Sequence, residues 1–191
     1  MKTLFSFLNL CAYVLLAFLA SWFISEKLKS PEITLYNVSE KNLEPCMNYW
    51  TSDTGYTDTM SISARAMRLY DQGEYAQAIE SFQRMEPNEN EEANYDLYLG
   101  ICYLKSGFAN LAVIHLSEAE SLFKKYKMIQ MSKWYLSLAY LKAGQEKEGV
   151  DKLFQLVGAN APQRYKAEEI LATIDGASNP IKSLKLVLLN K

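Results

Sequence analysis

The sequence predicts an all-α protein in which antiparallel helical hairpins stack side by side after an N-terminal transmembrane helix. Two observations lead to this fold class. Gly73 is followed by Gly107 after 34 residues (107 − 73) and by Gly144 after 37 more (144 − 107), with similar residue types around each glycine. Residues 4–24 contain no charged side chain. A period of this length is typical of helix–turn–helix repeats, and such an uncharged run is typical of a membrane span.

Apolar side chains with helical spacing flank each glycine. In residues 69–82 they recur every three or four positions on both sides of Gly73, which predicts two amphipathic helices joined by a tight turn. Small residues recur at fixed distances from the glycines, because two helix backbones must approach to about 8–10 Å there. These small residues are Ala66, Gly100, Ser137, Ala78, Ala112 and Gly149. The expected helices span about 59–72, 75–86, 91–106, 109–125, 128–143 and 146–157.

This pattern resembles the tetratricopeptide repeat family. The best copy covers residues 98–119, and the first copy covers 59–87. The third copy, 134–154, departs further from the family pattern because Gly149 replaces an alanine. The resemblance implies a short right-handed solenoid of three repeats over residues 59–160. The three extra residues of the second interval are expected to lengthen the helix that contains Phe123, or the turn after it.

The resemblance also implies a binding groove, because the first helix of each pair lines the concave side in this family. The residues expected to line a partner-binding groove here are Met67, Tyr70, Leu97, Ile101, Leu104, Lys105, Trp134, Leu138, Leu141 and Lys142. The version of the family that clamps a carboxylate needs basic and amide residues where this chain has Ser63, Met67, Leu97 and Ile101. The expected groove is apolar and aromatic, which suits a hydrophobic helix or an extended peptide.

The N-terminal segment, residues 1–27, is predicted to be a membrane anchor. As a helix, residues 4–24 would span about 31 Å, enough to cross the hydrocarbon core of a bilayer. A cleaved signal peptide is the alternative, but Phe18 and Leu19 suit a cleavage site poorly. Because a short N-terminal tail usually stays inside, the repeats are expected outside the cytoplasm, in the periplasm of a bacterial cell envelope.

Two further segments flank the predicted repeats. Residues 28–58 lack a sustained helical period and are predicted to be a linker. Tyr49 and Trp50 are more apolar than a free tether requires, so part of this segment is a candidate to pack along the repeats. Residues 161–191 are expected to form a divergent helical hairpin that caps the stack, its first helix ending near Gly176. An exposed apolar tail that recruits a partner is the alternative.

Composition argues against several classes of function. The net charge is −2 and no basic stripe appears, so a nucleic-acid partner is not expected. The three cysteines, Cys11, Cys46 and Cys102, lack metal-ligand spacing, and no cofactor motif occurs. His115 is the single histidine, and on a repeat helix it is expected to be a packed or surface residue. We therefore expect no metal site, no cofactor and no enzymatic activity.

These expectations lead to a membrane-tethered adaptor of the tetratricopeptide type. It would bind a protein partner through the groove and hold it near the bilayer, as linkage to an anchor does in general. The alternative is a structural or self-associating subunit whose groove is filled by its own residues 31–58 or by its C-terminal hairpin. A homo-oligomer is compatible with both. A third hypothesis, an enzyme that uses His115 or acidic residues, is disfavoured.

Overall fold

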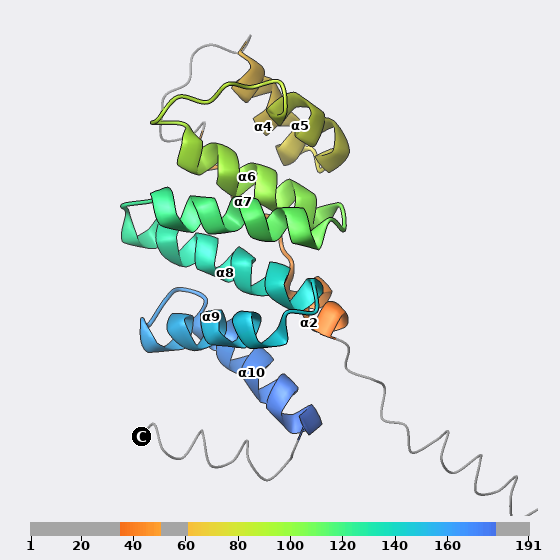
Figure 1. Ribbon diagram of the computed structural model, residues 1–191, viewed down its shortest axis with the longest axis vertical. Helices are drawn as coiled ribbons and strands as arrows, with labels where there is room; N and C mark the ends of the chain where they lie inside the picture. Colours follow the sequence, from red (N-terminus) through yellow and green to blue (C-terminus); the bar gives the residue numbers. More distant parts are fainter. Residues whose placement is uncertain (1–34, 51–60, 179–191) are drawn as a thin grey trace, which may run out of the picture. The chain divides into compact units, whose positions relative to one another are not determined.

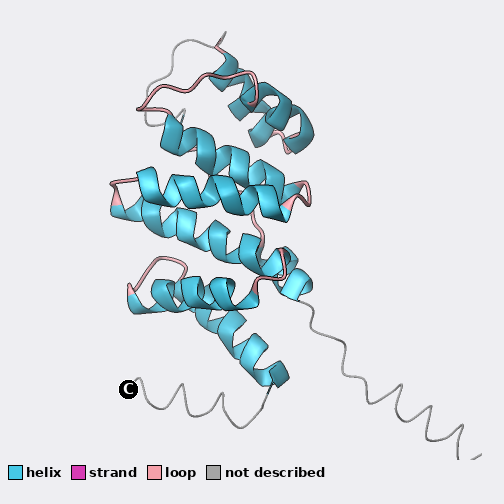
Figure 2. Ribbon diagram, in the orientation of Figure 1, coloured by secondary structure: helices cyan, strands magenta, loops and turns pink. Residues whose placement is uncertain are grey.

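The computed structural model describes residues 35–50 and 61–178, and all of them belong to one compact unit, Thr34–Lys191. The described residues form helices joined by turns and loops, with no strand among them (Figures 1 and 2). The helices are α2 (Leu35–Asn42), α4 (Ile62–Asp71), α5 (Tyr75–Phe82), α6 (Glu92–Lys105), α7 (Ala109–Leu122), α8 (Tyr126–Lys142), α9 (Glu146–Gly158) and α10 (Arg164–Ser178).

Helices α4 to α9 pack as three consecutive antiparallel pairs. Within each hairpin α4 packs on α5, α6 on α7 and α8 on α9, and each hairpin contacts the next through α5 with α6 and α7 with α8. Figure 1 shows these helices in chain order, followed by α10. One core, which includes Phe82, Leu116 and Leu153, runs through all of them. The expectation of an all-α fold built from sequential hairpins is confirmed.

Tight turns with one left-handed residue connect these helices. Gly73, Gly107 and Gly144 have φ values of 78°, 87° and 76°, a region in which a Cβ atom is unfavourable. After each glycine the next backbone N–H bonds back to a carbonyl five residues earlier, which closes the helix end. Asn160 repeats this geometry after α9, with φ 52° and the Ala161 N–H bonded to the Leu156 carbonyl. The same type of tight turn therefore also joins α9 to α10, where the sequence has no glycine at the left-handed position.

Two helix ends differ from the sequence-based expectation. Helix α5 ends at Phe82 instead of residue 86, and α7 ends at Leu122 instead of residue 125. The three extra residues do not lengthen α7, because Phe123 is extended, with φ −67° and ψ 136°. Instead α8, with 17 residues, is three residues longer than α6, with 14. In the first turn of α8 the Tyr126 hydroxyl donates to the Ala159 carbonyl at 2.5 Å. That contact ties the first turn of α8 to the end of α9.

Glycines at two helix crossings permit the close packing that the sequence predicted. A Cβ built on Gly100 would lie 2.7 Å from Leu116 Cγ and 3.2 Å from the Leu116 backbone nitrogen. A Cβ built on Gly149 would lie 2.8 Å from Leu141 Cδ2 and 3.2 Å from the Ser137 carbonyl oxygen. Because backbone atoms are among these neighbours, the helices would have to move apart to admit a side chain.

Replacing Gly100 with alanine is therefore expected to destabilise the fold, although alanine is the better helix former. We expect a net loss of about 1–2 kcal/mol in the free energy of unfolding, because overpacking outweighs the propensity gain. Gly158→Ala is the matched control, since nothing lies within 4 Å of its added methyl group; it is expected to stabilise by about 0.5 kcal/mol. Urea denaturation of both variants measures the difference, and a stabilising Gly100→Ala would contradict the close approach.

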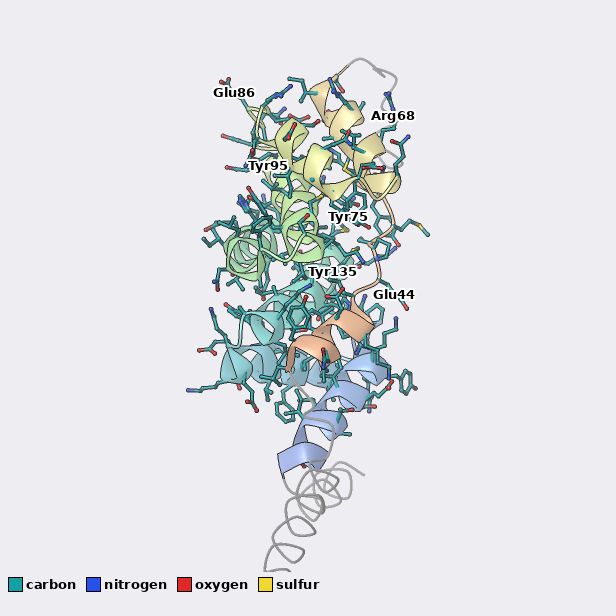
Figure 3. All side chains as sticks on the ribbon, turned by 90° about the vertical axis from the view of Figure 1, so that its right-hand side faces the viewer. Glu44, Arg68, Tyr75, Glu86, Tyr95 and Tyr135 are labelled. Carbon is teal, nitrogen blue, oxygen red and sulfur yellow. The ribbon has the colours of Figure 1, made fainter. Side chains whose placement is uncertain are left out.

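The segment before the repeats is folded against them. We call residues 35–50 the strap: α2 forms its first half, and residues 43–49 follow without helix or strand. The sequence has no helical period here, yet α2 packs on α8 and α10. In Figure 3 the strap, drawn in orange, runs beside α8 and on toward α4. A helix in this linker is a difference from expectation, and tertiary contacts account for it.

The predicted anchor, residues 4–24, lies outside the described residues. Among the helices of residues 35–50 and 61–178, none has the length and hydropathy that crossing a bilayer requires. At the other end, α10 reaches Ser178, past the expected end near Gly176. The second helix of the expected capping hairpin would fall in residues 179–191, which are also outside the described part of the chain.

Candidate functional site

The residues predicted to line the groove lie on α4, α6 and α8, the first helices of the three pairs. Eight of the ten are buried in the hydrophobic core, and the two lysines are half-buried. The buried residues are Met67, Tyr70, Leu97, Ile101, Leu104, Trp134, Leu138 and Leu141. We call this side of the three helices the groove face. The strap covers it through side-chain and main-chain contacts.

Four apolar side chains of the strap are buried in the core, namely Val38, Leu43, Cys46 and Trp50. Trp50 is only 2% exposed, and its ring stacks between those of Phe82 and Tyr98, with centroids 6.2 Å away on each side. By contrast Met47, between these anchors, is 70% exposed. The strap therefore contributes part of the hydrophobic core.

Phenol hydroxyls on α4 and α6 bind the main chain of the strap. The Tyr70 hydroxyl donates to the Cys46 carbonyl at 2.8 Å. The Tyr98 hydroxyl donates to the Met47 carbonyl at 3.0 Å and accepts from the Tyr49 backbone N–H at 2.7 Å. These bonds satisfy the Cys46 carbonyl and the Tyr49 N–H, and they add a stronger donor to the Met47 carbonyl, which also accepts from the Cys46 thiol at 3.2 Å.

Two more side chains of the groove face bind strap carbonyls. The Tyr135 hydroxyl of α8 donates to the Glu44 carbonyl at 2.9 Å, and the Lys105 ammonium of α6 donates to the Leu43 carbonyl at 2.9 Å. Figure 3 shows Tyr135 and Glu44 at the level of α8. In all, Tyr70, Tyr98, Lys105 and Tyr135 bind four of the five strap carbonyls from residue 43 to residue 47, all but that of Pro45. These contacts do not depend on strap side chains.

Charged groups also join the strap to the repeats. The Lys142 ammonium lies 2.5 Å from Glu40 Oε2 and 3.2 Å from the Leu104 carbonyl oxygen. It also lies 4.9 Å from the centroid of the Tyr36 ring. Two exposed ion pairs connect the strap to α10: Glu44 with Lys166 at 2.8 Å, and Lys41 with Glu169 at 3.6 Å. Both lysines of the predicted groove thus bind the strap.

Burial keeps the Cys46 thiol and the three phenols at this contact protonated. Desolvation raises the pKa of the Cys46 thiol from 9.0 to about 12. The same cause raises the pKa values of Tyr70, Tyr98 and Tyr135 well above that of a free phenol, and the neighbouring acids act in the same direction. All three phenols therefore remain neutral donors at physiological pH, as their hydrogen bonds to the strap require.

Labelling of Cys46 is expected to report whether the strap stays bound. Its pKa of about 12 leaves on the order of a thousandfold less thiolate than a free thiol at mildly alkaline pH, and its side chain is buried. In the native full chain Cys46 should therefore react with a thiol reagent far more slowly than in urea, as peptide mass spectrometry can measure. Equal rates in the two conditions would contradict a bound strap.

Two residues important to this contact, Tyr98 and Tyr135, were not among the predicted groove residues. The family pattern selects their neighbours Leu97 and Trp134 instead. A signal was present, because both tyrosines lie nine residues before a turn glycine, Gly107 or Gly144 (107 − 98 and 144 − 135). A phenol that recurs at the same repeat position can bind the same kind of main-chain group on successive hairpins.

The single histidine joins two helices of the second hairpin. His115 Nδ1 on α7 lies 2.8 Å from Asp96 Oδ1 on α6, and the imidazole stacks on Tyr103 with centroids 5.4 Å apart. Among the described residues, no group of three or more histidines, cysteines or acidic residues could hold a metal ion. The His115 contacts are those of a packed side chain.

A hollow of about 630 Å³ remains where the strap meets the end of α4. It is lined by strap residues from Pro45 to Asn48, by residues from Tyr70 to Gly73 at the end of α4, and by Tyr75. The Asn48 amide donates to Asp71 Oδ2 at 2.8 Å on its edge.

Comparisons with protein-family models, with curated proteins and with solved structures found no match to this chain. What is established is an all-α domain of consecutive antiparallel helix pairs whose groove face binds the chain's own strap.

Proposed function

We propose that this protein is a non-enzymatic structural subunit of the tetratricopeptide type, held at a membrane by residues 4–24, with its groove face closed by its own strap. The observation that supports it is the set of contacts along the strap: Tyr70, Tyr98, Lys105 and Tyr135 bind its main chain. Its apolar anchors, Trp50 among them, are buried in the same core as the repeats.

In this proposal the strap has a mechanical role. The sequence places it between the proposed anchor and the first repeat, so a load on the anchor would pass into the repeats through the strap contacts. Ten residues, 25–34, separate the proposed membrane span from the strap. The repeats would therefore be held near the bilayer, on the extracytoplasmic side if the N-terminal tail stays inside, as part of a protein assembly.

The second candidate is the adaptor, in which a protein partner takes the place of the strap. It is favoured by the way the strap is bound, because donors that bind main-chain carbonyls would accept another peptide of suitable shape. The hollow beside Met47 and Tyr75 would give such a peptide a place to begin binding.

Cross-linking of the full chain in its native membranes, followed by mass spectrometry, separates the two candidates. A lysine-reactive linker is expected to join Lys41 of the strap to Lys166 of α10, because each forms an ion pair across that contact. Links confined to this protein support the structural subunit. A reproducibly identified foreign protein linked to groove-face residues, with loss of the Lys41–Lys166 link, would support the adaptor.

A further inference from the structure

The contacts of the strap are made with residues far away in the sequence. Ser39 donates to the Leu138 carbonyl, 99 positions away, and Glu40 pairs with Lys142, 102 positions away. The covalent path from the strap to the repeats is residues 51–60, which lead into α4. Helix α4 has its own N-cap, since Ser61 Oγ accepts from the Ala64 N–H at 3.1 Å. The strap contacts therefore do not depend on which chain supplies the strap.

We infer that the groove face also binds the strap of a second copy, so that two copies exchange residues 35–50 reciprocally and form a dimer. This inference rests on the proposed function, because it assumes that the strap is the ligand of the groove face. The hydrogen bonds and ion pairs described between the strap and the rest of the domain are all kept in the exchanged dimer. Exchange of an identical element is a low-cost route to a dimer for this reason.

The chemistry of the contact favours a second copy over a foreign peptide. Three of the four buried apolar side chains of the strap, Leu43, Cys46 and Trp50, follow one another at intervals of three and four residues. Charged strap residues near them each face a residue of opposite charge on α8 or α10. The charged pairs are Glu40 with Lys142, Lys41 with Glu169, and Glu44 with Lys166. The strap of another copy carries all of these features in the same register.

The balance between closed chain and dimer depends on concentration. Ten linking residues can extend over at most about 33–36 Å, which limits how far apart two exchanging copies can be. A short linker gives its own strap an effective concentration in the millimolar range, so exchange is favoured where copies are crowded. Confinement by the proposed anchor to a membrane surface would supply such crowding.

Two tagged copies of the full chain test the exchange. Both carry a protease site inserted between Thr54 and Gly55; one copy has an N-terminal tag and the other a C-terminal tag. After co-expression, membrane solubilisation and cleavage, the N-terminal tag is used to recover whatever the tagged strap holds. Exchange predicts recovery of the C-terminally tagged repeats. Copies expressed and cleaved separately and then mixed are the control for exchange after cleavage.

Charge reversal at exposed pairs makes the test specific without disturbing the core. One copy carries Lys41→Glu and Glu44→Lys in its strap, and the other carries Lys166→Glu and Glu169→Lys in α10. Within each copy the strap and α10 then carry like charges at both pairs and repel each other. In the exchanged dimer every one of these pairs joins opposite charges. Recovery of the C-terminally tagged repeats should rise several-fold over the unaltered pair at low salt and return toward it at high salt. A chain with all four changes should behave like the unaltered one.

The outcomes separate the inference from the proposed function. If the tagged strap recovers only the repeats of its own copy, even with charge reversal, exchange is overturned and the closed subunit stands. If it recovers no repeats at all, the strap is not the ligand of the groove face and both ideas are wrong. If a foreign protein replaces the second copy on the recovered repeats, the adaptor is supported and the exchange is overturned.

Discussion

Trp50→Ala is expected to lower the free energy of unfolding by about 3–5 kcal/mol, the range typical of truncating a large buried aromatic side chain. The indole is 2% exposed and stacks on Phe82 and Tyr98, which belong to two different hairpins. Its removal would leave a cavity between them and would expose part of both rings. Urea denaturation followed by circular dichroism measures the loss.

The control for this variant is Met47→Ala, three residues earlier in the same strap. Met47 is 70% exposed, so its truncation should change the free energy of unfolding by less than about 0.5 kcal/mol. Labelling then shows where the loss occurs. If Trp50→Ala releases the strap first, Cys46 becomes reactive while Cys102, in the core of α6, stays protected. An unchanged stability in Trp50→Ala would mean that the strap is not part of the core.

The second large effect is a loss of stability in alkaline solution. Burial raises the pKa of the Cys46 thiol to about 12, and it also raises the pKa values of Cys102, Tyr70, Tyr98 and Tyr135 above their ordinary values of 9.0 for thiols and 10.0 for phenols. The folded chain therefore holds these protons after the unfolded chain has released them. Stability is full below about pH 9 and falls as the pH rises, because the unfolded state binds fewer protons.

The expected loss of unfolding free energy is large enough to unfold the domain in alkaline solution. Each group contributes about 1.4 kcal/mol per pH unit above its unfolded pKa. At about pH 11 the five groups together remove on the order of 5–10 kcal/mol, which is comparable to the whole stability of an ordinary domain. We therefore expect cooperative alkaline unfolding between about pH 10 and 12, with the buried tyrosines ionising in the same transition as the helices melt.

Tyr98→Phe provides the matched variant for the alkaline transition. It removes one buried phenol, so the slope of the free energy of unfolding against pH should fall by about 1.4 kcal/mol per unit above pH 10. Its stability at neutral pH should also fall, by about 1–2 kcal/mol, because the Tyr49 N–H loses its partner and the Met47 carbonyl keeps only the weaker Cys46 thiol donor. Tyrosinate absorbance and circular dichroism that change at different pH values would contradict this account.

The stability of the strap contact also bears on the two candidate functions. A strap that contributes several kcal/mol to the fold is not readily displaced by a weak peptide, whereas a strap that opens locally leaves the groove face available. Trp50→Ala and the labelling of Cys46 measure this difference directly. Exchange between copies has no such net free-energy cost, because the incoming strap restores the contacts that the outgoing strap loses.

The hairpins were predictable from the sequence because their determinants are local. Helical spacing of apolar residues and a glycine that tolerates positive φ specify each turn within about fourteen residues, as at Gly107. Small residues such as Gly100 mark the crossings for the same reason. The helix ends at Phe82 and Leu122 were placed less well, since packing against neighbours, and not spacing, decides where a helix stops.

The strap could not be placed in the same way. Residues 35–50 have no helical period, and what holds them is contact with side chains such as Tyr70, Tyr98 and Tyr135, up to 91 positions away. By itself the sequence determined that the chain forms stacked helical hairpins with an apolar face on their first helices. Only the tertiary structure decided what covers that face, because hydrogen bonds from side chains to a distant main chain leave no periodic trace in the sequence of the segment they bind.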